Sequence, residues 1–174
     1  MGPAVLHLAR TAIVQGRRRR AFSLIEILIV TVILAILAMV IVPRVSDASH
    51  EAAENSLKDD LRYLRTQIGV YKAQHRDLAP GITGNFLNQM TLYTDEAGTT
   101  SPTKTPTHKF GRYLMRMPAN PLNHKDTIKI SNAADLTAEV DDTTGWVYNP
   151  ATQQIIANTS GADNNGSGIA YSQY

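Results

Sequence analysis

The hydrophobic pattern of the chain begins with a long uniform run. Residues 22–42, FSLIEILIVTVILAILAMVIV, are apolar except for Ser23, Glu26 and Thr31. At about 1.5 Å per residue such a run is ~31 Å long as a helix, close to the ~30 Å hydrocarbon core of a bilayer. The pattern therefore predicts a membrane-spanning helix at 22–42.

Beyond Pro43 the apolar residues occupy one side only. They recur at steps of mostly three or four residues, at Leu57, Leu61, Leu64, Ile68, Tyr71 and Leu78. Charged and amide residues lie between them, so an amphipathic helix with one buried stripe is expected over 44–78. Proline removes a helical hydrogen bond, and Pro43 therefore either kinks one continuous helix or separates two.

The rest of the chain predicts short elements. Ala79-Pro80-Gly81 ends the helix, and the loop region 79–112 contains a short second helix at 83–93, capped by Thr83. Strands are expected at 113–117, 127–130, 145–148 and 154–158. The last two strands flank Asn149-Pro150 and predict a hairpin. We therefore expect an α+β fold in which the long helix packs on a small antiparallel sheet, a β-meander over 113–174.

Composition and charge limit the class of protein. A chain of 174 residues has room for one domain with an appendage. The net charge is +2, but five of the 17 basic residues and none of the 15 acidic residues lie in 1–21. The remainder is therefore acidic, and no nucleic-acid partner is expected. The absence of cysteine excludes disulfides and thiolate sites.

Four consecutive arginines, residues 17–20, stand just before the apolar run. A basic cluster beside the first span stays in the cytoplasm, so the following body is expected on the far side of the membrane. A secretory signal peptide is the alternative, because Ser46-Asp47-Ala48 has a small-x-small cleavage pattern. Its apolar region is usually only ~7–15 residues, shorter than the run at 22–42.

Glu26 is not explained by a plain membrane anchor. A carboxylate costs about 2.5–3.5 kcal/mol at the bilayer centre and less near an interface, so it usually has a partner. The alternative is local, because Ser23-Leu24-Ile25-Glu26 has the S-x-x-E form of a capping box and an acid in the first helical turn is favourable.

The stretch from Arg17 to Glu26, with the apolar run behind it, resembles the prepilin class of type IV pilins and type II secretion pseudopilins. The resemblance implies a basic leader, 1–21, that a prepilin peptidase removes between Ala21 and Phe22. Phe22 then becomes N-methylated, and Glu26 serves filament assembly. Pro43 stands where the family commonly has a proline, so the resemblance assigns it to assembly together with Glu26.

The order of elements resembles the major pseudopilin of type II secretion systems. So do Gly111-Arg112-Tyr113-Leu114, Met117-Pro118-Ala119-Asn120-Pro121 and Gly145-Trp146-Val147-Tyr148. This implies a structural subunit of a pilin-like filament, either a type II secretion pseudopilus or a type IV pilus. Its implied partners are copies of itself, minor pseudopilins, the prepilin peptidase, the inner-membrane assembly platform and, before assembly, membrane lipid. The implied location is the bacterial inner membrane, single pass with a periplasmic head, and then a periplasmic or extracellular filament.

Catalytic chemistry is not indicated. The five histidines are scattered and expected on the surface, and nucleophile, phosphate-loop and zinc motifs are absent from the sequence. We therefore expect no enzyme. The alternative function is a signal-anchored extracytoplasmic binding or enzymatic domain that does not polymerise.

One polar segment, residues 160–168, has the composition of a calcium loop. Asp163, Asn164 and Ser167 offer hard oxygen ligands among glycines, although not in EF-hand spacing. Asp141 and Asp142 are alternative ligands, and a mobile polar tail is the alternative to a metal site. Major pseudopilins bind calcium in a C-terminal loop, so the resemblance implies calcium here.

Overall fold

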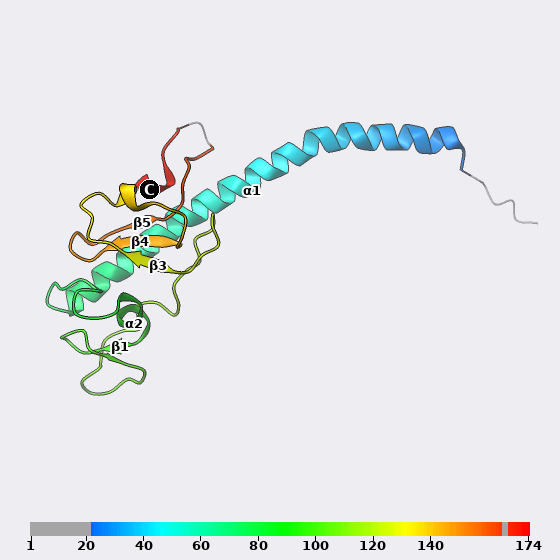
Figure 1. Ribbon diagram of the computed structural model, residues 1–174. Coiled ribbons are helices and arrows are strands. Elements are labelled where there is room, and N and C mark those ends of the chain that lie inside the picture. The colour runs from blue at the N-terminus through cyan, green and yellow to red at the C-terminus, as the bar shows by residue number, and fades with distance from the viewer. Residues whose placement is uncertain (1–21, 165–166) are drawn as a thin grey trace, which may run out of the picture. The chain divides into compact units, whose positions relative to one another are not determined.

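The structure is a computed structural model that describes residues 22–164 and 167–174; the side chains of Val40 and of residues 42–47 are outside this description. The chain forms two compact units, Met1–Val42 and Pro43–Tyr174. The long helix α1, Leu24–Gln74, contributes residues to both (Figure 1). The backbone of α1 is helical through Pro43, so of the two alternatives for this proline the structure has the continuous helix.

The C-terminal end of α1 is set by left-handed residues. Arg76 and Asp77 have φ angles of 54° and 68°, and the Asp77 N–H donates to the Lys72 carbonyl at 3.1 Å. This is the six-to-one bond of a Schellman motif, which turns the chain out of the helix. The helix therefore ends before Leu78, which is 37% exposed and does not belong to the buried stripe.

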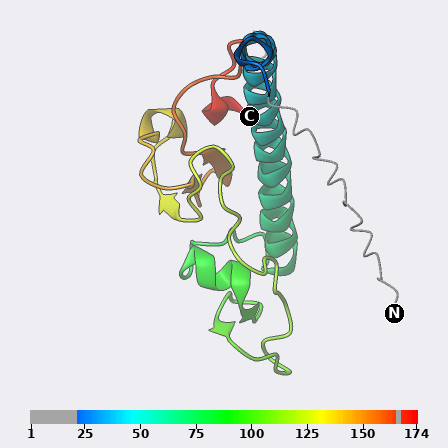
Figure 2. The same cartoon turned by 90° about the vertical axis from the view of Figure 1, so that its right-hand side faces the viewer.

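The predicted amphipathic stripe is confirmed over the remaining positions. Its five members are at most 4% exposed: Leu57, Leu61, Leu64, Ile68 and Tyr71. They share one core with Trp146 and Tyr148 of the sheet and with Met90 of the second helix. Within the unit 43–174, which we call the head, Figure 2 shows the other elements to one side of that unit's part of α1.

The main sheet has three strands: β3, Ile128–Ile130; β4, Trp146–Asn149; and β5, Gln154–Ala157. Their order is β3-β4-β5, and the predicted hairpin of β4 and β5 is confirmed as antiparallel. The Asn149 side-chain oxygen accepts from the Ala151 N–H at 2.8 Å, which folds the turn locally.

The remaining pair corrects the expectation of a purely antiparallel sheet, because β3 runs parallel to β4. Parallel neighbours need a crossover of roughly a dozen residues or more. Residues 131–145 provide it, with the short 3-10 helix η1, Leu136–Glu139, on the way. The α+β class is confirmed, and the sheet is mixed.

The segment between α1 and the sheet folds around a short helix. Helix α2, Phe86–Thr91, is capped by the side chain of Asn85 rather than by Thr83. It is followed by the two-stranded antiparallel pair β1, Tyr93–Thr94, and β2, Thr100–Ser101.

The strand predicted at 113–117 was wrong. The N–H groups of Tyr113 and Leu114 both donate to the Met90 carbonyl, at 3.0 and 2.8 Å, so they cap α2 and do not pair with a strand. A second 3-10 helix, η2, Tyr171–Gln173, follows the polar segment near the C-terminus.

Candidate functional site

The first half of α1 carries apolar side chains on every side. Each large apolar side chain described between Phe22 and Ile41 is at least 48% exposed, and that of Leu24 reaches 86%. A helix that is apolar all round is normally surrounded by other apolar groups. The described chain does not supply them, so this surface needs an external partner.

We predicted a membrane-spanning helix at 22–42. Among the residues that the structure describes, no helix has both the length and the apolarity required to cross a membrane.

The processing motif is described only from Phe22 onward; Ala21 and the arginines at 17–20 lie outside the described residues. The Glu26 carboxylate accepts a hydrogen bond from the Ser23 N–H at 3.4 Å, and the Glu26 N–H donates back to the Ser23 carbonyl at 3.1 Å. The first contact is long for a hydrogen bond and therefore weak. Glu26 is exposed, so its carboxylate is accessible to another molecule.

The candidate cation loop comprises the described residues around Asp163. Pairing of Ala162 with Ala170 closes the loop at its base. The Asp163 Oδ2 atom accepts from the Tyr174 hydroxyl at 3.1 Å and from the Ser167 hydroxyl. The Ser167 bond is the main cause of a lowered pKa of the Asp163 carboxyl, although burial acts in the opposite direction.

The other oxygen of this carboxylate is unpartnered. Asp163 is 8% exposed, and within the described residues its Oδ1 atom is buried without a hydrogen-bond partner. Buried polar atoms are nearly always paired, so an orphaned carboxylate oxygen fits a hard cation such as calcium. Among the described residues no three or more His, Cys, Asp or Glu side chains are arranged so that they could hold a metal ion together. A calcium ion here would therefore need carbonyl, amide or hydroxyl oxygens as further ligands.

The predicted ligands lie differently in this loop. Asp163 and Ser167 contact each other. The Asn164 N–H instead donates to Glu54 of α1 at 2.9 Å. The alternative pair is already engaged: the Asp141 carboxylate contacts Lys129 at 3.0 Å, and the Asp142 Oδ1 atom accepts from the Ser160 N–H at 2.9 Å.

Sequence reasoning missed Glu54 and Tyr171. Glu54 is 2% exposed, and its carboxylate accepts a hydrogen bond from the Tyr171 hydroxyl at 3.1 Å. A signal was present in the sequence, because Glu54 precedes Leu57 by three positions and so continues the apolar stripe of α1. A charged residue on the buried face of an amphipathic helix indicates a specific partner.

One histidine also departs from its prediction. His75 is fully buried and not on the surface; its ring stacks on Tyr71 at 3.8 Å between centroids, and its Nε2 atom lies 2.9 Å from the Thr94 hydroxyl. This arrangement joins the end of α1 to β1 and serves packing.

Comparison with known proteins gives three relatives. The family described as prokaryotic N-terminal methylation motif matches residues 16–42. The type II secretion system core protein G of Pseudomonas aeruginosa is 32% identical over 110 residues, which are 62% of this chain and 70% of that protein. The proteins of the same name from Aeromonas hydrophila and Dickeya chrysanthemi are 27% and 38% identical, over 62% and 32% of this chain and 70% and 37% of their own lengths.

No solved structure matches the chain. The methylation motif falls on the segment that carries the arginines, Phe22 and Glu26, and the match to the Pseudomonas protein extends well beyond it in length. The chain therefore belongs to the family of the type II secretion system core protein G, and it is a pseudopilin, a structural subunit of a filament.

Proposed function

We propose that the chain is made as a precursor, cut between Ala21 and Phe22, N-methylated on Phe22 and polymerised through the apolar half of α1 into a type II secretion pseudopilus. The observation that carries this proposal is the exposure of apolar side chains on all sides of that helix. Copies packed side by side bury those surfaces, and burial of apolar area is the main driving force of association. This contact joins different surfaces of successive copies. Because the rotation from copy to copy does not close a ring, the copies form an open fibre.

Before assembly the same surface is proposed to lie in the lipid of the inner membrane. The arginines at 17–20 favour a cytoplasmic N-terminus, so the head at 43–174 faces the periplasm. The partners that follow are the prepilin peptidase, the inner-membrane assembly platform, minor pseudopilins and further copies of the chain.

Glu26 is proposed to neutralise the amino terminus of a neighbouring copy. After the cut, the new α-amino group of Phe22 is a positive charge four residues before Glu26. That spacing is about 6 Å along a helix, so a copy shifted axially by this amount brings the two charges together. Each charge is costly when buried alone, and pairing removes most of that cost.

Calcium is proposed as the ligand of the loop around Asp163. The unpartnered Oδ1 atom of Asp163 and the neighbouring Ser167 hydroxyl and Asn164 amide are of the chemical type that calcium binds. The bound ion would supply positive charge to a buried carboxylate and connect the two sides of the loop.

The fibre itself is the test of the proposal. Filaments sheared from cells that produce the chain with its secretion system should contain it as a subunit that begins at methylated Phe22. A chain that keeps its leader and stays in the membrane fraction without fibres would instead support the signal-anchored, non-polymerising domain.

A further inference from the structure

Glu54 is an acidic residue on the apolar face of α1. Its side chain is 2% exposed and lies one turn before Leu57, which is fully buried. Its Oε1 atom accepts two hydrogen bonds, from the Asn164 N–H at 2.9 Å and from the Tyr171 hydroxyl at 3.1 Å. Both donors are neutral, so Glu54 acts here as a hydrogen-bond acceptor for the C-terminal segment and not as half of an ion pair with them.

The residue that Glu54 holds is the direct neighbour of Asp163. Fixing the Asn164 N–H orients the peptide group that joins the two residues, because the peptide unit is planar and rigid. Asp163 is thereby anchored from α1 on one side, while its Oδ2 atom is bound by the Tyr174 hydroxyl on the other.

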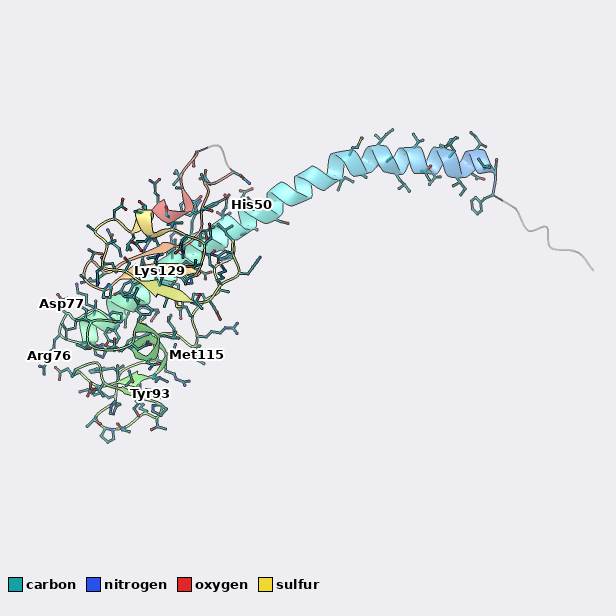
Figure 3. The ribbon with its side chains drawn as sticks, in the orientation of Figure 1. His50, Arg76, Asp77, Tyr93, Met115 and Lys129 are labelled. Atoms are coloured by element: carbon teal, nitrogen blue, oxygen red, sulfur yellow. The ribbon has the colours of Figure 1, made fainter. Side chains whose placement is uncertain are left out.

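The two tyrosines connect the two carboxylates. The rings of Tyr171 and Tyr174 meet edge to face, with centroids 5.9 Å apart, and each hydroxyl donates to a different carboxylate. Burial, together with the neighbouring carboxylates, raises the pKa of both hydroxyls to about 12. Both therefore remain protonated donors at neutral pH. His50 of α1, labelled in Figure 3, lies 3.3 Å from the Tyr171 hydroxyl and completes the cluster.

We propose that Glu54 is the positioning residue of the cation loop. By accepting from Asn164 and Tyr171 it holds Asp163 so that the Oδ1 atom remains free for a divalent cation. This role rests on the calcium binding proposed above, and it gives α1 a direct part in cation affinity although α1 supplies no ligand.

A positioning role differs measurably from a purely structural one. A buried side chain that only stabilises the head changes the melting temperature equally with calcium and with chelator. A side chain that holds the loop in its binding conformation changes the difference between these two temperatures. Without it, part of the binding free energy is used to order the loop, and calcium stabilises the chain less.

The experiment is calcium titration by calorimetry of the full chain purified in detergent. Glu54→Ala removes the acceptor and should weaken calcium binding by about tenfold. Glu54→Gln keeps an oxygen at the acceptor position and should stay within about threefold of the parent chain. Glu51→Ala, one turn earlier on the exposed side of α1, is the matched control and should bind like the parent.

Hydrogen exchange adds a readout at the contact itself. The Asn164 amide should exchange slowly in the parent and in Glu54→Gln, and quickly in Glu54→Ala. Tyr171→Phe removes one donor while keeping the ring, so it tests the cluster even where Glu54→Ala fails to fold; it should weaken calcium binding by about threefold.

The outcomes separate the two proposals. Unchanged calcium affinity in Glu54→Ala, with a parent that binds calcium, overturns the positioning role alone. Equal loss in Glu54→Gln and Glu54→Ala overturns the acceptor argument, because charge and not geometry would then be required. A parent chain that binds no calcium overturns the calcium proposal and, with it, the role of Glu54.

Discussion

The ammonium group of Lys129 lies 3.0 Å from a carboxylate oxygen of Asp141 and joins β3 to the crossover that leads to β4. Lys129, labelled in Figure 3, is the middle residue of β3. The same ammonium contacts Glu139 at 3.0 Å, and the other Asp141 oxygen accepts from the Asn158 side chain at 2.8 Å. The Asp141 carboxylate, in the crossover connection, therefore contacts both β3, at Lys129, and the residue that follows β5, Asn158.

This contact predicts acid sensitivity of the head. Hydrogen bonds from Thr143 and Asn158 and the contact with Lys129 hold the pKa of the Asp141 carboxyl well below its usual value. A group with a lowered pKa contributes stability above its unfolded pKa of about 3.9, and this is lost as the pH falls through the folded value. Asp141→Asn should lower the urea midpoint at pH 7 and flatten its decline below about pH 4. Exposed Asp126→Asn is the control, and identical pH profiles for both variants would contradict the assignment.

The buried stripe of α1 should dominate the stability of the head. Leu61 is fully buried, so Leu61→Ala is expected to cost about 2–5 kcal/mol of unfolding free energy through lost burial and a cavity. Arg62→Ala, next to it but exposed, should cost less than about 1 kcal/mol because its contact with Asp59 is a surface ion pair. Denaturant unfolding of both variants measures the difference. Equal effects would mean that the stripe is not the main contact of the head.

Processing is tested by the mass of the mature chain. We expect removal of residues 1–21 and one methyl group on the amino nitrogen of Phe22. Intact-mass analysis of protein from membranes distinguishes this from the alternatives. A retained Met1, or a new N-terminus after Ala48, would contradict the prepilin interpretation.

The two roles considered for Glu26 predict different phenotypes. Loss of one member of a buried charge pair costs about 3–5 kcal/mol per contact, so Glu26→Ala should be inserted and cut normally but fail to enter fibres. A capping role is worth only about 1 kcal/mol, and Ser23→Ala, which removes the cap residue, should assemble almost normally. Electron microscopy of cells without the parent chain gives the readout. Fibres of normal number and length from Glu26→Ala would assign the residue to capping.

Calcium should stabilise the folded chain if the loop around Asp163 binds it. Binding to the folded state alone adds about 2.7 kcal/mol when the free ion is a hundredfold above its Kd. Chelator should therefore lower the melting temperature of the parent chain and leave that of Asp163→Ala unchanged. If chelator lowers the melting temperature of Asp163→Ala but not that of Asp142→Ala, the ion lies at the alternative acidic pair.

Periodicity predicted the parts of this fold that depend on one segment at a time. The stripe from Leu57 to Tyr71 and the hairpin at Asn149 are local patterns, and both are present. The parallel pairing of β3 with β4 depends on how residues 131–145 cross the sheet, which alternation of side chains does not encode. The segment at Tyr113 failed as a strand because its N–H groups are taken by the end of α2, a contact between distant parts of the sequence.

The candidate sites divide in the same way. Phe22 and Glu26 could be predicted as site residues because their spacing from the arginines lies within one short motif. The place of Glu54 in the apolar stripe can be seen in the sequence. Its partners Asn164 and Tyr171 cannot, because only folding brings them close to it.

The hydrogen bond between Glu54 and Asn164 joins residues that are 110 positions apart, so the two partners are synthesised at different times. A contact at such separation closes a large loop, and the chain entropy lost in closing it must be offset by the contacts that the loop brings together. During synthesis α1 emerges long before its partner, so Glu54 then remains hydrated on a face that is otherwise apolar. A truncated subunit that lacks the C-terminal segment therefore exposes Glu54 on the surface of α1, whereas the complete subunit buries it.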